Sequence, residues 1–592
     1  MNSKEIRSSF LNFFRDKNHK IIPSVSLISP DPSVLFTTAG MQPLSPYLAG
    51  KKDPLKDFGT RHLASCQKCF RTNDIDEVGD NTHHTFFEML GNWSIGVDEK
   101  GNYFKEGAIQ LALEFLIKKL KLNLERISIT FFKGDETVPE DKETFLLWQK
   151  YGISKERIRP MGKSDNFWGP VGKEGPCGPC SEIYYLKENG QEVEIWNLVF
   201  MEYYQKEDGG LEKLSQTNID TGIGFERLVA VLQNKESSFE TDLFEFLIPH
   251  LESNSQKRYQ DYKREFRIIM DHLRALTFLI GDGVLPSNLG QGYILRRIFR
   301  RAMRYFFLLN VPTKNIPFLI SLIIENYGDI WPEIKEKKEF ILRVVEQEEE
   351  KFSRVLKRGM ELILKEIDNL KRKSERIMPG KVVFDFYQNY GFPFELTQEI
   401  ARENDLLVSR EEFEQYFRKH QEISRKSMEK KFGGHGFKEE KELDDKDKTE
   451  KIKRLHTATH LLHAALRQIL GENVFQQGSD ITPERLRFDF SFSRKLTPEE
   501  LKNIEDLVNQ KIKEGLIVKK EKKKLKDALE EGALAFFKER YPPEVYVYTI
   551  GDFSKEICAG PHVEKTSELG HFKIVKEEAV SANVRRIRAI LE

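Results

Sequence analysis

The chain of 592 residues contains 39% hydrophobic and 32% charged residues, and its 94 Lys+Arg are balanced by 94 Asp+Glu. This composition is that of a globular protein of about three to five domains, and the balance excludes a bulk excess of positive charge, so nucleic-acid binding requires a local basic face. The sequence contains no run of about 18 apolar residues, so we predict no membrane span, and the N-terminus lacks a secretory signal pattern. Five cysteines in so long a chain favour a reducing compartment, so we expect a cytoplasmic protein with no membrane partner.

The first part of the chain combines helical spacing with short extended runs. Residues 2–20 have the apolar spacing of an amphipathic helix, and the run that contains Met41, VLFTTAGMQPL, reads as a buried strand. In the stretch Cys66–Trp93, Arg71 follows an aromatic residue and precedes an acidic, glycine-containing hairpin loop. Arg71 would lie at a strand end and point into a cleft, but for a single arginine the pattern alone favours a surface hairpin.

Between Gly162 and Val199, a loop dense in glycine and proline precedes two strand-like runs. Such a loop cannot be helical, and we predict that it shapes the wall of a pocket. Within this stretch Trp168 offers an apolar wall and Asn197 offers a neutral hydrogen-bonding group.

The segment TNIDTGIGFERL (Thr217–Leu228) places a carboxylate, Asp220, just before the glycine pair Gly222 and Gly224, with Arg227 three residues further on. Glycines let a backbone approach a ligand closely, because they lack Cβ. A carboxylate at their edge can hold a small cation, and a guanidinium beyond them can hold phosphate oxygens. The pattern favours a site that binds an amino group and a nucleotide tail together.

Beyond about residue 240 the sequence becomes helical and charged. Arg296, Arg300 and Arg304 recur at intervals of four and form one basic stripe on a predicted helix. The stripe suits phosphate contacts, and a solvated helix face is the alternative. A stretch of mixed charge that begins with glycines, residues 432–450, is predicted to be a flexible linker.

A second chemical pattern lies near the end of the chain. His456 and His460 share one face of a predicted helix, and Cys558 and His562 are again four residues apart. Three imidazoles and one thiolate make a sufficient tetrahedral set for Zn²⁺. We therefore predict a metal site; the alternative for two histidines on an apolar helix is packing.

Several runs of the sequence resemble, in order, motifs of the alanyl-tRNA synthetase family, whose members are class II aminoacyl-tRNA synthetases. These runs are LFTTAGMQPL, CFRTNDIDEVG, HHTFFEMLGNW, NFWGPVGKEGPCGPCSEIYY, EIWNLVFMEY and NIDTGIGFERL. The likeness continues in patches to the last residues. It implies an α+β fold with three parts: an antiparallel class II sheet flanked by helices, a helical tRNA-recognition domain, and an α+β editing domain with zinc. The boundaries that we expect are 1–240 for the catalytic domain, 241–431 for tRNA recognition, 432–450 for the linker and 451–592 for editing.

By this resemblance the catalytic residues are Arg71, Asp220 and Arg227. The ATP site would comprise Arg71, His84, Met41, Gly224 and Arg227, and the alanine site Trp168, Asn197, Val199, Asp220 and Gly222. The tRNA contacts would include Asn288, Arg296, Arg300, Arg304 and Gln388; the editing pocket would include Gln476; and zinc would be held by His456, His460, Cys558 and His562.

The sequence departs from the family pattern at several places. Gln388 stands where the family has an aspartate that helps read a G·U pair, and Ala559 and Pro561 replace a glycine and a threonine in the Cys-x-x-x-His motif. There is no room for the family's β-barrel before the editing domain, and the usual C-terminal domain does not follow it, so we expect a monomer.

The resemblance implies ATP-dependent ligation of L-alanine to tRNA(Ala), with Mg²⁺ accompanying ATP and with hydrolysis of mischarged seryl- and glycyl-tRNA. A second site has a physical reason: a pocket sized for alanine cannot exclude glycine, and it rejects serine by only about a hundredfold. Two alternatives from other classes are a stand-alone aminoacyl-tRNA deacylase and a non-catalytic tRNA-binding relative.

Overall fold

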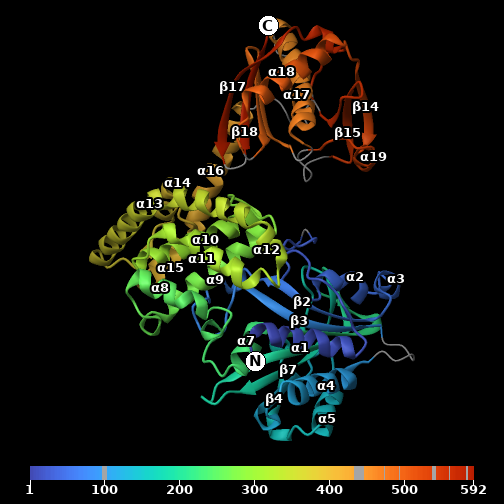
Figure 1. Ribbon diagram of the computed structural model, residues 1–592, viewed down its shortest axis with the longest axis vertical. Helices are drawn as coiled ribbons and strands as arrows, with labels where there is room; N and C mark the ends of the chain where they lie inside the picture. The colour runs from blue at the N-terminus through green and yellow to red at the C-terminus, as the bar shows by residue number, and fades with distance from the viewer. Residues whose placement is uncertain are drawn as a thin grey trace. The chain divides into compact units, whose positions relative to one another are not determined.

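The computed structural model describes residues 1–31, 33–96, 103–431, 446–471, 474–492, 494–535, 542–558, 560–581 and 584–592. The chain forms two compact units, Met1–Met378 with Val382–Val408, and Pro379–Lys381 with Ser409–Glu592 (Figure 1). Of the predicted linker, residues 432–445 lie outside the described residues, and residues 446–450 begin helix α17 (Lys446–Leu470). Ala559 also lies outside them.

A nine-stranded sheet organises the first unit, with the order β1-β2-β3-β9-β8-β7-β4-β5 and β6 paired to β7. The strands are β1 (Lys20–Ile21), β2 (His62–Phe70), β3 (Phe86–Ile95), β4 (Ile127–Phe132), β5 (Ile158–Met161), β6 (Phe167–Trp168), β7 (Gly175–Leu186), β8 (Glu192–Gln205) and β9 (Leu211–Gly224). The central pairs are antiparallel, whereas β1–β2 and β4–β5 are parallel. The predicted α+β fold with a helix-flanked sheet is confirmed, but the sheet is mixed at its edges because long connections carry the chain back in parallel.

Helices pack on this sheet through their apolar faces. Helix α1 (Ser3–Asp16) begins at Asn2, whose side chain accepts the backbone N–H of Glu5 in a capping box, and it buries Ile6 and Phe10. Helix α7 (Phe225–Leu232) continues directly from β9 and packs on β3 and β8. The helix therefore holds the end of β9 in place.

The helical part of the first unit is joined to the sheet by a buried arginine. Arg274, on the almost entirely buried helix α9 (Lys263–Gly281), donates to the carbonyl oxygen of Phe86 at 2.6 Å and to Glu226 Oε1 at 2.8 Å. The other main helices are α4 (Lys105–Leu113), α5 (Lys142–Lys150), α8 (Ile248–Ser255), α10 (Gly290–Leu308), α11 (Ile316–Tyr327), α13 (Lys338–Arg372), α14 (Gly380–Tyr390), α15 (Phe394–Arg402) and α16 (Arg410–Lys431). No described helix combines the length and apolar composition that a membrane crossing needs.

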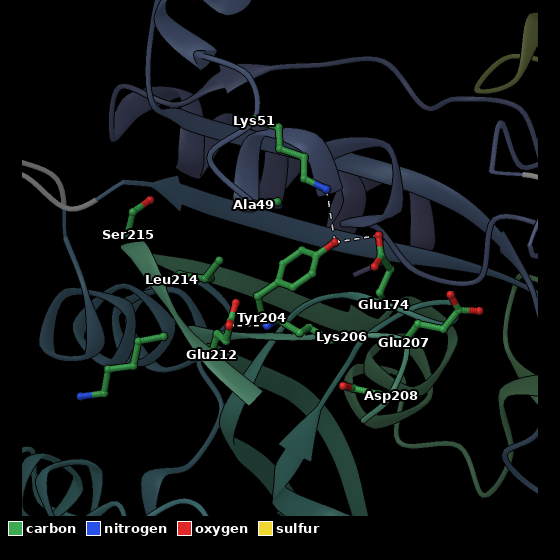
Figure 2. A pocket seen from close by; sticks show the side chains of 11 residues that line it. Ala49, Lys51, Glu174, Tyr204, Lys206, Glu207, Asp208, Glu212, Leu214 and Ser215 are labelled. Carbon is green, nitrogen blue, oxygen red and sulfur yellow. Dashed lines mark hydrogen bonds and ion pairs between the residues drawn. The ribbon is translucent and has the colours of Figure 1, made fainter. Parts of the chain in front are cut away.

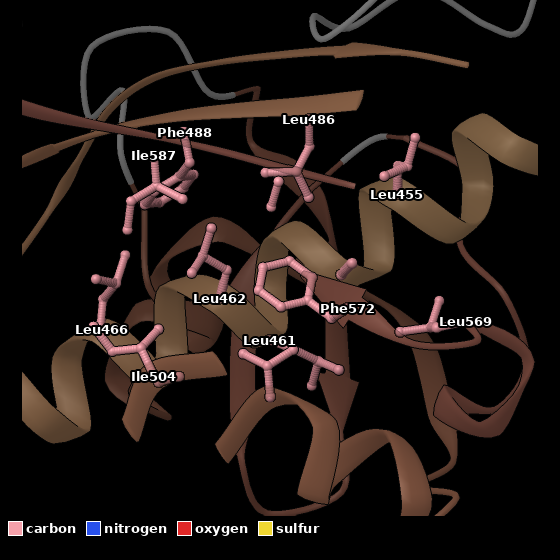
Figure 3. Packing of buried hydrophobic residues seen from close by; sticks show 14 of the residues in the cluster. Leu455, Leu461, Leu462, Leu466, Leu486, Phe488, Ile504, Leu569, Phe572 and Ile587 are labelled. Atoms are coloured by element: carbon pink, nitrogen blue, oxygen red, sulfur yellow. The ribbon is translucent and has the colours of Figure 1, made fainter. Parts of the chain in front are cut away.

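The second unit packs helix α17 among two antiparallel sheets. Its sheets have the orders β12-β13-β18-β17 and β14-β15-β16. Their bounds are β12 (Gln476–Thr482), β13 (Arg485–Ser491), β14 (Val518–Lys524), β15 (Glu544–Ile550), β16 (Ser554–Ile557), β17 (Phe572–Ser581) and β18 (Val584–Leu591), with helices α18 (Pro498–Lys513) and α19 (Leu525–Glu530). Figure 3 shows Leu461, Leu462 and Leu466 of α17 among buried side chains that include Phe488 and Ile587. This apolar packing fixes the rotation of α17 and hence the direction of its histidines.

Candidate active site and metal centre

A cavity of about 250 Å³ opens on the sheet of the first unit. Its lining includes every residue that the sequence predicts for the ATP and alanine sites: Met41, Arg71, His84, Trp168, Asn197, Val199, Asp220, Gly222, Gly224 and Arg227. These residues come from widely separated stretches of the chain. The pairing of β3, β9 and β8 brings them together.

Asp220 forms the anionic part of this cavity. It is 5% exposed, lies opposite Val199 of β8 in the sheet register, and accepts a hydrogen bond from Trp93 Nε1 at 2.6 Å. Burial raises the pKa of Asp220 to about 7, and the Trp93 N–H only partly opposes this rise. A cationic ligand that pairs with this carboxylate would remove the cost of its burial.

The neighbouring wall is small and partly polar. Gly222 lies opposite Asn197, and a Cβ built on Gly222 would lie 2.9 Å from Met89 Sδ. Asn197 donates from Nδ2 to Glu182 Oε1 at 3.4 Å, while its Oδ1 is buried with no hydrogen-bond partner among the described residues. This oxygen can accept a hydrogen bond from a ligand in the cavity.

Two arginines lie at the polar part of the cavity, and each is held by the protein. Arg71 follows β2, donates from Nε to the carbonyl oxygen of Thr38 at 3.2 Å, and stacks over the ring of Phe87 at 4.9 Å. Arg227, in the first turn of α7, donates from Nη1 to Glu194 Oε2 at 2.5 Å. Both guanidinium groups are partly exposed, so they retain donors that can bind phosphate oxygens.

His84 is held from two sides. Its Nε2 lies 2.7 Å from Ser238 Oγ and its Nδ1 lies 3.4 Å from Asp271 Oδ1 on α9, and the ring stacks parallel to Phe244. Asp271 also accepts from the backbone N–H of Thr85 at 3.0 Å. The helical part of the unit therefore positions the hairpin that carries His84.

The sequence reasoning missed two carboxylates of the cavity, Glu182 and Glu194. Burial, followed by the nearby charge of Glu194, raises the pKa of Glu182 to about 7, although Tyr184 donates to its Oε2 at 2.7 Å. The signal that could have found them is an acidic residue in each of two otherwise apolar strand-like runs, EIYY and EIWN.

The residues predicted to contact tRNA lie on α10, on α14 and in the loop before α10. Arg296 and Arg300 both bind Glu348 Oε1 of α13, at 3.0 and 2.8 Å, and their side chains are 18% and 14% exposed. Arg304 is 3% exposed and is paired with Glu403. Asn288 and Gln388 are exposed, and Asn288 Oδ1 accepts a hydrogen bond from Arg296.

A larger hollow of about 660 Å³ lies beside the β8–β9 hairpin, and none of the predicted site residues lines it (Figure 2). There Tyr204 Oη lies 3.2 Å from Lys51 Nζ and donates to Glu174 Oε1 at 3.0 Å. Its exposed lysines and carboxylates largely satisfy one another, so its size does not make it the better candidate site.

In the second unit, His456, His460, Cys558 and His562 converge. One ligating atom from each residue can be chosen so that all four lie within 4.8 Å of one another. Cys558 Sγ lies 3.3 Å from His456 Nε2, and the rings of His456 and His562 stack at 4.2 Å. The predicted residues thus form one cluster from helix α17 and the loop after β16.

The surroundings of the cluster orient its imidazoles. His456 Nδ1 lies 3.1 Å from the carbonyl oxygen of Pro561, His460 Nδ1 lies 3.2 Å from Glu556 Oε2, and His562 Nδ1 lies 3.1 Å from Thr457 Oγ1. Such contacts at Nδ1 favour Nε2 as the nitrogen of each ring that would ligate a metal. Three imidazoles and one thiolate fit Zn²⁺.

Gly560 allows the loop to reach the helix. A Cβ on this residue would lie 2.1 Å from His456 Cε1, so only glycine permits this approach. Gln476, the predicted editing residue, begins β12 of the same unit and donates from Nε2 to Ser479 Oγ at 3.0 Å.

Two family models match the chain. The model of class II (A) tRNA synthetases matches residues 5–479. The model of the threonyl and alanyl tRNA synthetase second additional domain matches residues 545–588, which include two of the four cluster residues.

Curated relatives match the whole chain. A protein of Borrelia hermsii is 46% identical over 100% of both chains, and one of Treponema pallidum is 44% identical over 99% of this chain and 98% of its own. One of Petrotoga mobilis is 36% identical over 99% of this chain and 79% of its own. Each of the three is named alanine–tRNA ligase. The alignment with the last spans 712 positions, more than the 592 residues here, so that relative carries segments that this chain lacks.

Proposed function

This chain belongs to the alanine–tRNA ligase family of class II tRNA synthetases, and from that premise we propose that it joins L-alanine to the 3′ end of tRNA(Ala) at the expense of ATP. The observation that carries the proposal is the cavity in which a buried carboxylate, a buried amide oxygen and two held guanidinium groups meet. A zwitterionic amino acid and a nucleotide are the ligands that this combination of charges suits.

We propose that Asp220 binds the ammonium group of alanine. Asn197 Oδ1 would accept a further hydrogen bond from the same group, and Val199 would enclose the methyl group. Val199 belongs to a buried apolar cluster, against which Trp168 packs. Gly222 leaves room for the small ligand, since any side chain there would meet Met89.

Activation then needs positioning more than acid–base chemistry. The alanine carboxylate is already an anion, so it attacks the α-phosphorus of ATP without a protein base, and the bond to pyrophosphate breaks. Arg71 would stabilise charge on the α-phosphate and Arg227 would bind the outer phosphates. Carboxylate oxygens of Glu182 and Glu194 are the ligand type that Mg²⁺ prefers, and Mg²⁺ brought with ATP would neutralise phosphate charge there. The 3′ hydroxyl of tRNA then takes the acyl group and AMP leaves.

We further propose that the cluster of the second unit serves hydrolysis of seryl- and glycyl-tRNA. His456, His460, Cys558 and His562 would hold Zn²⁺, which when bound supplies a Lewis acid beside the ester. Glu556 and Pro561 would keep two of the imidazoles in the tautomer that ligates through Nε2. Gln476 is proposed to contact the substrate in this unit.

The proposed tRNA contacts of the first unit follow from exposure. Asn288 and Gln388 are exposed and can reach base edges. Arg296 and Arg300 share one carboxylate, Glu348, so the pair keeps a net positive charge for phosphate. We leave Arg304 out, because its guanidinium is buried against Glu403.

One assay tests these assignments together: charging of tRNA(Ala) and of acceptor-stem G·U variants, with alanine and serine supplied separately. We expect alanyl-tRNA to accumulate, replacement of the wobble pair to reduce it, and seryl-tRNA to accumulate only in the Cys558→Ala variant. A stand-alone deacylase would hydrolyse seryl-tRNA without forming an adenylate, and a non-catalytic relative would do neither. Absence of alanine-dependent adenylate would therefore overturn the proposal.

A further inference from the structure

Strand β14 lies at the edge of the three-stranded sheet of the second unit, on the side of α17 away from β17 and β18 (Figure 1). Its seven residues, VKKEKKK, include five lysines. A chain with no net charge thus concentrates positive charge on one strand edge. None of these lysines belongs to the predicted metal cluster, so that cluster does not explain why they are concentrated here.

The register of β14 and β15 places lysines beside tyrosines. Lys520 lies opposite Tyr548 and Lys522 lies opposite Tyr546, and residues opposed in this way point to the same face of a sheet. Lys520 Nζ lies 4.3 Å from the ring centre of Tyr546 and 5.7 Å from that of Tyr548. Lys519, opposite Thr549, points to the other face.

This lysine- and tyrosine-bearing face continues into the metal cluster. The ring of Tyr548 lies 4.2 Å from that of His562, and the backbone N–H of Cys558 donates to the carbonyl oxygen of Tyr546 at 3.1 Å. Tyr548 is 5% exposed, whereas Tyr546 is 42% exposed. The face therefore runs from solvent at Tyr546 to His562 and Cys558, two of the four predicted zinc ligands.

The charges of the face are accessible to a partner. Lys522 Nζ lies 2.6 Å from Glu544 Oε2, but both side chains are more than half exposed, so this pair contributes little and a phosphate can replace it. Lys520 is exposed. By contrast, Lys523 on the opposite face is paired with Glu531 at 2.6 Å.

We propose that Lys520, Lys522, Tyr546 and Tyr548 form a platform for the single-stranded 3′ end of an acylated tRNA, and that this platform leads the terminal ester to the metal cluster. Aromatic faces stack on bases of any identity, and lysines between them contact the phosphates. Tyr546 stacks on a base, Lys520 and Lys522 bind phosphates, and Tyr548 borders the reacting end. An acidic peptide would match the lysines but would leave the exposed ring of Tyr546 without a stacking partner. The inference rests on the hydrolytic role proposed for the cluster.

The first test measures KM and kcat for hydrolysis of seryl-tRNA by the full chain. Tyr546→Ala should raise KM about 5- to 100-fold by loss of one stacked base, and Lys520→Ala should raise it less and flatten its salt dependence. In both variants kcat, zinc content and alanine activation should stay unchanged. The matched control is Lys519→Ala, on the same strand but the opposite face, and equal effects of Lys519→Ala and Lys520→Ala would overturn the platform.

A second test needs no variant and separates this inference from the proposed function. The full chain is treated with a lysine-directed acylating reagent, with and without saturating uncharged tRNA(Ala), and modification is read by mass spectrometry. We expect tRNA to slow modification of Lys520 and Lys522 severalfold and to leave Lys519 unchanged. If the chain does not hydrolyse seryl-tRNA, the proposed editing role fails, and the labelling still decides the platform: equal labelling with and without tRNA rejects it.

Discussion

The cavity of the first unit and the cluster of the second unit present opposite chemistry to a ligand. In the cavity, a buried carboxylate that faces one indole N–H has its pKa raised to about 7 and gains from a cation. In the cluster, histidines held at Nδ1 and a thiol present soft ligands to a metal. The comparison teaches that the proposed amino-acid site and the proposed metal site share no residue, so we expect that each can be damaged without the other.

The largest expected effect is in the cavity. Asp220→Asn keeps the size of the side chain and its acceptor for Trp93 but removes the charge that we propose pairs with the alanine ammonium. We expect a loss of about 2–5 kcal/mol in transition-state binding, which is roughly a 30- to 5000-fold fall in kcat/KM for alanine-dependent pyrophosphate exchange. Seryl-tRNA hydrolysis should be retained.

The matched control for this change is Asp208→Asn, in the exposed turn between β8 and β9. It removes the same charge beside the same sheet, outside the cavity. Near-normal exchange in Asp220→Asn, or an equal loss in Asp208→Asn, would refute the assignment of the ammonium site.

The next effect lies in the cluster. Glu556 is buried between two histidines. Its Oε1 lies 2.8 Å from His463 Nδ1, and its Oε2 lies 3.2 Å from His460 Nδ1. Glu556→Gln should lower zinc affinity about 10- to 100-fold, because His460, the predicted ligand, loses the carboxylate that orients it. Competition with a chelator measures this affinity. Alanine activation is the internal control, and a fall in activation would show that the two sites are not separable.

Sequence reasoning found these two regions with unequal strength. The four cluster residues follow from spacing, because His-x-x-x-His on a helix and Cys-x-x-x-His in a loop each place two ligands together. The cavity residues came mainly from family resemblance, since only Asp220, the glycines and Arg227 lie close in sequence. Their assembly depends on cross-strand register, such as Asn197 opposite Gly222, which local patterns do not reveal.

The fold was predictable in class but not in detail. Apolar periodicity and motifs indicated a sheet flanked by helices, whereas the parallel edge pairs depend on long connections. The stripe of Arg296, Arg300 and Arg304 shows the same limit: spacing predicted one face, but Glu348 and Glu403, distant in sequence, decide how much of each arginine is exposed. The acid in the apolar run EIYY was the local signal for Glu182, but only the register of β7 with β8, in which Glu182 lies opposite Asn197, shows that it lines the cavity.

A smaller effect concerns pH. Burial raises the pKa of Asp220 from 3.8 to about 7, so the folded ligand-free protein binds this proton more tightly than the unfolded chain does. This contribution to stability is fully present below about pH 4 and is lost as the pH rises through 7. The proposed pairing with the alanine ammonium needs the ionised form of Asp220, so kcat/KM for alanine should rise about tenfold between pH 6 and 8.

The pKa of Glu182 is also raised to about 7, and Glu182 lines the same cavity as Asp220, together with Glu194 and Arg227. Either carboxyl group could therefore produce a change of activity near pH 7. The pH profile of Glu182→Gln separates the two carboxyl groups. An inflection that persists near pH 7 in this variant assigns it to Asp220, and its disappearance would assign it to Glu182 instead.

The smallest expected effect comes from a substitution that reduces the space beside Asp220. In Gly222→Ala the new methyl group would lie 2.9 Å from Met89 Sδ, and the flexible methionine would shift toward the cavity. We expect about 1 kcal/mol less stability and a roughly fivefold higher KM for alanine, measured by denaturant unfolding and pyrophosphate exchange. Gly162→Ala is the control, since its nearest neighbour would lie 3.7 Å away at an ordinary backbone angle. If Gly222→Ala changed stability but not the KM for alanine, the glycine would serve packing of Met89 alone, and the amino-acid site would have to lie elsewhere in the cavity.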